Sequence, residues 1–197
     1  MLKRCFDISA SLVGLLFIFP IFVFISIWIK LDSSGPVFFR QNRVGRYGVL
    51  FDIYKFRTMK VDSESAGRLT VGSDSRITSS GHFLRKTKID ELPQLFDVLM
   101  GRMSFVGPRP EVPEFIDCYP KDVKEKVLSV RPGITDRASI EMVDENEILA
   151  RYQDSRQAYI DIILPIKQSY YLKYVDNNSL WGDLLIILST FKKIIIR

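Results

Sequence analysis

Residues 85–110 decide the fold, and they read RKTKIDELPQLFDVLMGRMSFVGPRP. Within this stretch the adjacent acids Asp90 and Glu91 follow three cations and precede a set of apolar residues at helical spacing. That set is Leu92, Leu95, Phe96 and Leu99. Recurrence at i, i+3, i+4 and i+7 is typical of one face of an α-helix. The pattern therefore predicts a helix that the two acids open and whose apolar face packs inward.

The start of this predicted helix allows two interpretations of the acids. Asp90 is a favoured N-cap residue, and Pro93 is tolerated in a first turn, where its missing N–H would have no partner. Glu91 would face the positive end of the helix dipole, and the same position would keep Asp90 ionised. A capped structural helix and a catalytic carboxylate pair both fit this pattern.

Composition and charge narrow the kinds of site that the chain can hold. With 197 residues, 47% of them hydrophobic, one catalytic domain is expected. Residues 1–60 carry nine Lys/Arg against three Asp, and this basic block suits anionic lipid, phosphate ligands or nucleic acid. An adjacent apolar run favours lipid. His82 is the single histidine, and the two cysteines are far apart, which argues against His-based chemistry and a disulfide framework.

The apolar run covers residues 12–29, LVGLLFIFPIFVFISIWI, and contains no charge. As a helix it would be about 27 Å long, against a bilayer core of about 30 Å. Pro20 predicts a kink or break near its middle. Basic residues flank both ends, so by the positive-inside rule each end prefers the cytoplasm, which favours a re-entrant hairpin. A single span, a secretory signal peptide and a buried core helix are the alternatives.

The remaining segments predict a small β-hairpin followed by helices and loops. The hairpin would place its basic residues at lipid head groups or at a phosphate, and these residues are Arg40, Arg43, Arg46, Lys55 and Arg57. The last helix would either pack on the domain or lie in the membrane interface. The predicted segments are strands at 37–41 and 49–56, a loop at 62–80, helices at 113–119, 122–128, 145–163 and 179–197, and a turn at 131–135.

The reactive groups of this chain are expected to be carboxylates. Two adjacent carboxylates suit Mg²⁺ with a diphosphate substrate, and a carboxylate can also act as a nucleophile that forms an acyl phosphate. In Gly107-Pro108-Arg109-Pro110 the prolines fix the backbone and the glycine permits a close approach. Arg109 is therefore a candidate phosphate clamp, and an ordinary surface turn is the alternative.

Several motifs, spread over almost the whole chain, resemble those of one family. The sequence is similar to the bacterial sugar transferases, the monotopic phosphoglycosyl transferases that move a phosphosugar from a nucleotide sugar to polyprenyl phosphate. The matching stretches are Lys3-Arg4 with Phe6-Asp7, residues 35–41, 54–59, 84–87, 89–95, 103–110 and 132–135, and Ser179 to Asp183. Departures are Phe19, where the family often has Ser, and residues 97–102 and 136–139. The last of these leaves the sugar open.

The resemblance implies a two-step reaction with assigned residues. Asp90 would be the nucleophile that attacks the phosphorus attached to the sugar, and Glu91 the Mg²⁺ ligand. Arg85 and Arg109 would hold phosphate or nucleotide. Pro110, Lys55 and Arg57 complete the predicted substrate-binding set. The donor would be a UDP-sugar, the acceptor undecaprenyl phosphate and the released product UMP.

The expected architecture is an α+β, mainly helical protein with a kinked re-entrant membrane helix and interfacial amphipathic helices. Residues 1–34 would be embedded in the bacterial inner membrane, and residues 35–197 would form a cytoplasmic catalytic domain in contact with inner-leaflet phospholipid. Nucleic acid is not an expected partner, and homo-oligomer formation stays open. A membrane-docked diphosphate hydrolase and a non-enzymatic basic membrane scaffold are the rival functions.

Overall fold

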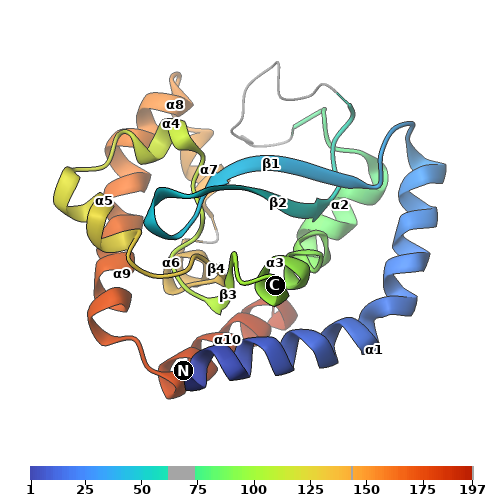
Figure 1. Ribbon diagram of the computed structural model, residues 1–197. Coiled ribbons are helices and arrows are strands. Elements are labelled where there is room, and N and C mark those ends of the chain that lie inside the picture. Colours follow the sequence, from blue (N-terminus) through green and yellow to red (C-terminus); the bar gives the residue numbers. More distant parts are fainter. Residues whose placement is uncertain (62–73, 143, 197) are drawn as a thin grey trace.

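The computed structural model describes residues 1–61, 74–142 and 144–196, and it shows a mainly helical α+β fold with a small β-hairpin (Figure 1). The apolar run lies within α1 (Leu2–Asp32), which is long and apolar enough to cross a membrane. Only 17% of its most apolar window is buried in the protein. Pro20 lies inside the helix, which stays continuous but changes direction near its middle (Figure 1). This bend agrees with the predicted kink.

Polar contacts fix the start of α1 to the rest of the protein. Asp7 is buried and accepts hydrogen bonds from Ser104 Oγ (3.1 Å) and the Phe105 N–H (3.2 Å). The Arg4 guanidinium donates to the carbonyl oxygens of Val98 (2.6 Å) and Leu99 (3.0 Å). Those carbonyls belong to the last turn of α3 (Gln94–Leu99), so Arg4 stabilises the negative end of that helix.

The end of α1 is fixed in a similar way. Asp32 accepts hydrogen bonds from the N–H (2.9 Å) and the hydroxyl (2.8 Å) of Ser80. The buried Arg57 guanidinium donates to three carbonyl oxygens of the segment that follows α1, those of Ser33, Ser34 and Pro36. Both ends of α1 are therefore bound to the same body of protein, one on each side of the bend.

The predicted hairpin is confirmed, with a longer first strand than expected. β1 (Phe38–Val44) pairs antiparallel with β2 (Leu50–Phe56), in a register that runs from Phe38 opposite Phe56 to Val44 opposite Leu50. Along β2 the side chains of Phe51 and Ile53 are buried in one hydrophobic cluster, and Phe56 is buried in another, against α1 and α2. This positions the hairpin as one wall of the site described below.

The acidic pair lies between α2 (Ser79–Lys86) and α3, inside a 3₁₀ turn formed by Ile89–Glu91. Two expectations fail here. Thr78 caps α2 by accepting from the Gly81 N–H (3.1 Å), so the end of the predicted loop at 62–80 begins a helix, while 62–73 lie outside the described residues. Asp90 is not an N-cap, because the backbone reaches the 3₁₀ turn through Lys88 in the left-handed region (φ 59°).

The 3₁₀ turn also explains why the predicted apolar face of α3 is shifted. A 3₁₀ turn has three residues per turn, so it changes the helical phase of the residues that follow. Leu95 and Val98 are buried, whereas Phe96 is 39% exposed. The inward face therefore uses Val98 in place of Phe96.

A short parallel strand pair fixes the segment that carries Arg109. β3 (Ser104–Val106) pairs with β4 (Gly133–Thr135), where the sequence had predicted only a turn. The two backbones approach closely beyond this pair, since a Cβ atom on Gly133 would lie 2.1 Å from the Gly107 nitrogen. The close approach expected at Gly107 is thus confirmed.

The helices of the second half form the largest hydrophobic core. Its buried members include Phe115, Tyr159, Ile163 and Leu164. The helices predicted at 113–119 and 122–128 are confirmed, whereas the one at 145–163 is interrupted after Leu149 and resumes at Ser155. The elements are α4 (Pro113–Ile116), α5 (Lys121–Val127), α6 (Arg137–Glu141), α7 (Glu145–Leu149), α8 (Ser155–Ala158), a π turn (Tyr159–Ile163) and α9 (Leu164–Asn177).

The final helix, α10 (Leu180–Ile196), begins beside the start of α1, where Lys3 forms an ion pair with Asp183. It packs on β3, β4 and α6 through a face that buries Asp183 and Ile186. The apolar face that the sequence singled out is exposed instead of packed on the domain. Its exposed members are Trp181, Leu185, Leu188, Phe191 and Ile195.

We expect Asp7→Ala to lower the free energy of unfolding by about 1.5–3 kcal/mol, because it leaves the Phe105 N–H without its carboxylate acceptor. The measurement is denaturant unfolding in detergent. The control is Ser9→Ala, an exposed position two residues away on the same helix, which should change stability by less than about 0.5 kcal/mol. Equal stability of the two variants would contradict the anchoring role of Asp7.

Candidate functional site

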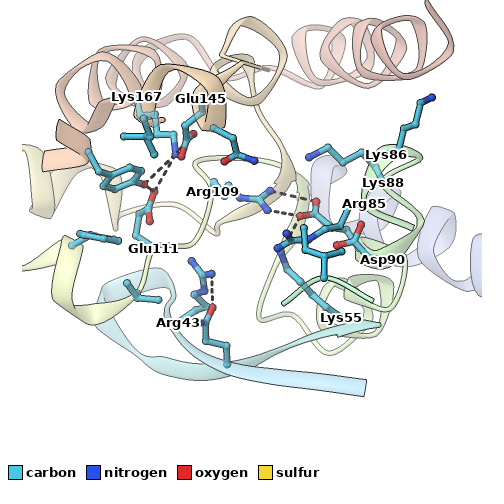
Figure 2. Close-up of a pocket in the computed structure, with 18 of the residues that line it drawn as sticks. Arg43, Lys55, Arg85, Lys86, Lys88, Asp90, Arg109, Glu111, Glu145 and Lys167 are labelled. Carbon is cyan, nitrogen blue, oxygen red and sulfur yellow. Dashed lines mark hydrogen bonds and ion pairs between the residues drawn. The ribbon is translucent and has the colours of Figure 1, made fainter. Parts of the chain in front are cut away.

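A cavity of about 570 Å³ lies between the hairpin, the acidic turn, the segment after Gly107 and the helices α7 and α9 (Figure 2). Its wall carries seven cationic and four anionic side chains. The cations are Arg43, Lys55, Arg85, Lys86, Lys88, Arg109 and Lys167, and the anions are Asp90, Glu91, Glu111 and Glu145. The excess positive charge suits a polyanionic ligand such as a diphosphate.

Glu91 is the carboxylate that the cations neutralise. It pairs with Lys55 (Oε1 to Nζ, 2.9 Å), and the Arg109 guanidinium donates to both of its oxygens. Burial alone would raise the pKa of Glu91, but the charges of Arg109, Lys55 and Lys88 outweigh burial and hold that pKa well below its usual range. Glu91 is therefore ionised.

Asp90 lies in the opposite situation although it is the next residue. Its side chain is buried, and no described residue donates a hydrogen bond to its Oδ1 atom. Burial and the neighbouring charge of Glu91 raise the pKa of Asp90 to about 6, a shift that Lys55 and Lys88 only partly offset. At neutral pH Asp90 is therefore still mostly ionised, but its pKa lies above the ordinary value, a shift that the helix-start argument did not include.

Lys55 and Arg85 reach the acidic pair from two different elements. Lys55 comes from β2, and burial lowers its pKa to about 8 although Glu91 acts to raise it. Arg85 comes from the last turn of α2, and burial lowers its pKa as well, against the charge of Asp90. Both side chains line the cavity on the Asp90 side (Figure 2).

Arg109 lies near the middle of the cavity wall and separates two charged clusters (Figure 2). Its backbone is held between Pro108 and Pro110, just after the close approach at Gly107. The ion pair with Glu91 raises the pKa of the Arg109 guanidinium above its already high usual value. Arg109 is therefore always charged, and its fixed backbone places its guanidinium as a hydrogen-bond donor at a defined position in the cavity.

The second charged cluster forms the far wall of the cavity, and sequence reasoning missed it. Tyr159 donates to Glu111 Oε1 (2.7 Å), while Lys167 contacts the Tyr159 hydroxyl (3.1 Å) and pairs with Glu145 (2.7 Å). The sequence points to this second cluster in one way, because Glu111 directly follows the Gly107-Pro108-Arg109-Pro110 motif. Lys167 lies in α9, a helix that the sequence did not predict, so its contact with Glu111 needs the tertiary fold.

Five of the seven predicted site residues line this cavity, namely Asp90, Glu91, Arg85, Arg109 and Lys55. Arg57 and Pro110 lie outside its described lining. Arg57 holds the end of α1, and the Pro110 carbonyl accepts from Arg43 (2.9 Å).

The stretches that depart from the family pattern include Asp97, Arg102 and Asp136, and each of these has a structural contact. Asp97 pairs with Arg102 (2.8 Å) and accepts from the Tyr54 N–H (3.0 Å). Asp136 caps α6 by accepting from the Ser139 N–H (2.9 Å).

The acidic pair also determines how this site could bind a metal ion. Across residues 1–61, 74–142 and 144–196, no three or more Asp, Glu, Cys or His side chains converge as a metal site. Mg²⁺, however, is commonly held by one or two carboxylates together with substrate phosphates and water. The adjacent carboxylates of Asp90 and Glu91, with one buried oxygen that lacks a hydrogen bond, fit that mode of binding.

Comparisons with known proteins agree on one family. The family model described as "Bacterial sugar transferase" matches residues 1–197. An Aeromonas hydrophila protein named UDP-N-acetylgalactosamine-undecaprenyl-phosphate N-acetylgalactosaminephosphotransferase is 38% identical over 98% of this chain and 44% of its own length. The Escherichia coli UDP-glucose:undecaprenyl-phosphate glucose-1-phosphate transferase is 36% identical over 98% of this chain and 40% of its own length.

A third relative has nearly the same length as this chain. The Bacillus subtilis protein named uncharacterized sugar transferase EpsL is 36% identical over 99% of this chain and 88% of its own length. The chain therefore spans less than half of the first two relatives and most of the third.

We expect Asp90→Asn to raise the free energy of unfolding by about 1–3 kcal/mol at pH 7.5 in a chelator-containing buffer. The folded-state pKa of about 6 lies above the ordinary value of 3.8, so ionised Asp90 destabilises the fold above about pH 6. As the pH falls toward 4 the carboxyl becomes protonated, and the difference from the wild type should disappear. Thermal unfolding across this pH range tests it.

The control for this measurement is Asp52→Asn, an exposed aspartate on β2 that should show no such difference. A lower stability of Asp90→Asn at pH 7.5 would contradict the burial penalty.

Proposed function

The chain belongs to the bacterial sugar transferase family, and we propose that it transfers a sugar-1-phosphate from a UDP-sugar to undecaprenyl phosphate. The relatives' names describe such transfers for UDP-N-acetylgalactosamine and UDP-glucose. This reaction would be the first membrane step in the synthesis of a glycoconjugate. Which sugar is transferred stays open.

The observation that carries this proposal is the difference between two neighbouring carboxyl groups. Glu91 is held ionised by Arg109 and Lys55, whereas burial raises the pKa of Asp90 and leaves one of its oxygens without a hydrogen bond among the described residues. Paired carboxyls whose environments separate their pKa values take different chemical roles. Asp90 is the nucleophile. Glu91 positions the cationic side chains of Lys55 and Arg109, which the diphosphate needs as partners.

In the first step, a carboxylate oxygen of Asp90 attacks the phosphorus attached to the sugar. The bond from that phosphorus to the bridging oxygen breaks, and UMP leaves with that oxygen and its electron pair. Arg109 and Lys55 stabilise the negative charge that gathers on the phosphate oxygens. The product on the enzyme is an acyl phosphate that carries the sugar.

In the second step, a phosphate oxygen of the undecaprenyl phosphate attacks the same phosphorus. The bond between that phosphorus and the Asp90 oxygen breaks, so a lipid-linked diphosphate sugar forms and the carboxylate is restored. A lipid acceptor fits a chain whose α1 exposes a long apolar surface. Water in place of the lipid would make the enzyme a hydrolase.

Mg²⁺ is the cofactor that we propose for this site. Glu91 would hold the ion together with the donor phosphates, and the ion would neutralise charge on the diphosphate. Before the donor binds, Arg109 and Lys55 occupy the Glu91 oxygens. These cations therefore keep Glu91 oriented toward the cavity.

We also propose that residues 1–34 form a re-entrant membrane element and that residues 35–197 form a cytoplasmic domain. Arg4 and Asp7 at the start of α1 and Asp32 at its end all bind the same domain, and α1 bends between them (Figure 1). A straight span would carry one end of the helix across the bilayer, away from that domain. The contacts at both ends thus favour the hairpin at the inner leaflet.

The decisive experiment incubates the purified protein with Mg²⁺ and a panel of UDP-sugars, first without and then with undecaprenyl phosphate. Without acceptor we expect at most one equivalent of UMP per enzyme, because the phosphosugar stays on Asp90. With acceptor we expect turnover for the matching sugar. Asp90→Asn should lower that turnover by at least about 1,000-fold, since the nucleophile is lost.

The control is again Asp52→Asn, which should turn over like the wild type. Continuous release of free sugar phosphate without lipid would identify a hydrolase instead. No UMP from any donor would favour the scaffold, and full turnover by Asp90→Asn would rule out the covalent step.

The topology has its own test, in which Leu2→Cys is placed in a Cys5→Ser background and Cys118 marks the catalytic domain. We expect a membrane-impermeant maleimide to label neither cysteine in intact spheroplasts and both after permeabilisation. The reason is that a re-entrant helix leaves both of its ends on the cytoplasmic side. Labelling of position 2 in intact spheroplasts would establish a span.

A further inference from the structure

A second cavity of about 210 Å³ lies next to the catalytic cavity and differs from it in chemistry. It lies between α3, α6, β4 and α10, and apolar side chains dominate its wall. Those that line it include Leu92, Leu95, Ile140, Ile187, Phe191 and Ile194. We call it the apolar groove.

The two cavities meet at the reactive residues. Lys86, Lys88, Glu91 and Arg109 line both of them. A ligand in the apolar groove can therefore present a charged head group to the same place where the donor diphosphate is bound.

We propose that the apolar groove binds the first isoprene units of the polyprenyl phosphate acceptor, with the acceptor phosphate at Lys86 and Lys88. This inference rests on the proposed function and assigns a binding site for its second substrate. The charge distribution supports the assignment, because a phosphate joined to a hydrocarbon chain needs cations at one end of its site and apolar side chains beyond them.

The size of the apolar groove argues for a single chain. At about 210 Å³ it is smaller than the 300–1,000 Å³ of typical small-molecule pockets, so it holds only a short part of one hydrocarbon chain. A phospholipid would bring two acyl chains and a larger head group. The remainder of the prenyl chain would have to lie outside.

The position of α10 gives that remainder a path. Phe191 lines the apolar groove and is also part of the exposed apolar face of α10. The groove is thus continuous with a surface that suits the membrane interface. An acceptor can therefore enter from the membrane while its phosphate reaches Asp90 from the side of Lys86 and Lys88.

This arrangement also separates the two substrates of a two-step reaction. The nucleotide sugar occupies the polar cavity and releases UMP there, and the lipid approaches the same phosphorus through apolar walls. Only the shared residues contact both ligands. A change deep in the apolar groove should therefore affect the second step and spare the first.

The test compares Ile194→Trp with Ile195→Trp, two neighbouring positions on α10. Ile194 lines the apolar groove, whereas Ile195 is 81% exposed and lies outside its described lining. Both variants add the same indole to the same helix, so they share any general effect on α10. Each variant is assayed as the full chain in detergent for the UMP burst with donor alone and for the KM of undecaprenyl phosphate.

We expect Ile194→Trp to raise the KM for undecaprenyl phosphate at least about tenfold while its UMP burst stays within a factor of two of the wild type. Ile195→Trp should match the wild type in both measurements. If Ile194→Trp gives no burst, Ile194→Ser replaces it, and a KM increase of about threefold or more with an intact burst is then expected.

Equal KM values for the two Trp variants would overturn the groove assignment. Binding to phospholipid vesicles is measured separately by cosedimentation, and weaker binding of Ile194→Trp with an unchanged KM would also overturn the assignment, in favour of a phospholipid occupant. A wild-type protein that shows no UMP burst would instead refute the proposed function, and the acceptor site with it.

Discussion

Two adjacent carboxyl groups buried beside a cationic cavity are the constraint on which the rest of the structure depends. Removing Asp90 and Glu91 from water is unfavourable, and their mutual repulsion adds to that cost. The fold offsets this cost mainly for Glu91, because Lys55 and Arg109 both form ion pairs with Glu91. These two cations come from the hairpin and from the segment after β3, so both elements must be fixed relative to the 3₁₀ turn. The raised pKa of Asp90 is therefore a property of the tertiary fold.

Features set by neighbours in the sequence could be predicted. The uncharged apolar run at 12–29 predicted a helix of nearly bilayer length, and α1 contains it, with a bend near its middle. Two β-like runs separated by a turn-rich stretch predicted the β1–β2 hairpin, because strand and turn composition are local properties. The acids at 90–91 were correctly placed at the start of a helical segment that includes α3. Each of these predictions needed only a short window of sequence.

Features that depend on distant contacts could not be predicted in the same way. The helix-start argument considered only one turn, so it did not include burial and the charge of Glu91, which raise the pKa of Asp90. The strand β4 gains its hydrogen bonds from β3, which a sequence window around Gly133 does not contain. Lys167 contacts the Tyr159–Glu111 pair only because α9 packs beside the cavity. In each case the missing information was a neighbour that is remote in the chain.

Only a short segment of the chain connects the start of the apolar helix α1 to the acidic pair. As a straight helix its 31 residues would extend about 46 Å, more than a bilayer core of about 30 Å. The bend shortens that reach and lets Arg4 cap the last turn of α3, while the acids occupy the turn just before the first residue of α3. One six-residue helix thus separates the contact of Arg4 from the turn that carries the Asp90 carboxyl. If α1 lies in a bilayer and Asp90 is the nucleophile, as proposed above, a connection this short would fix the depth of Asp90 relative to the bilayer. A phosphate on a membrane lipid could then meet Asp90 only where that depth matches.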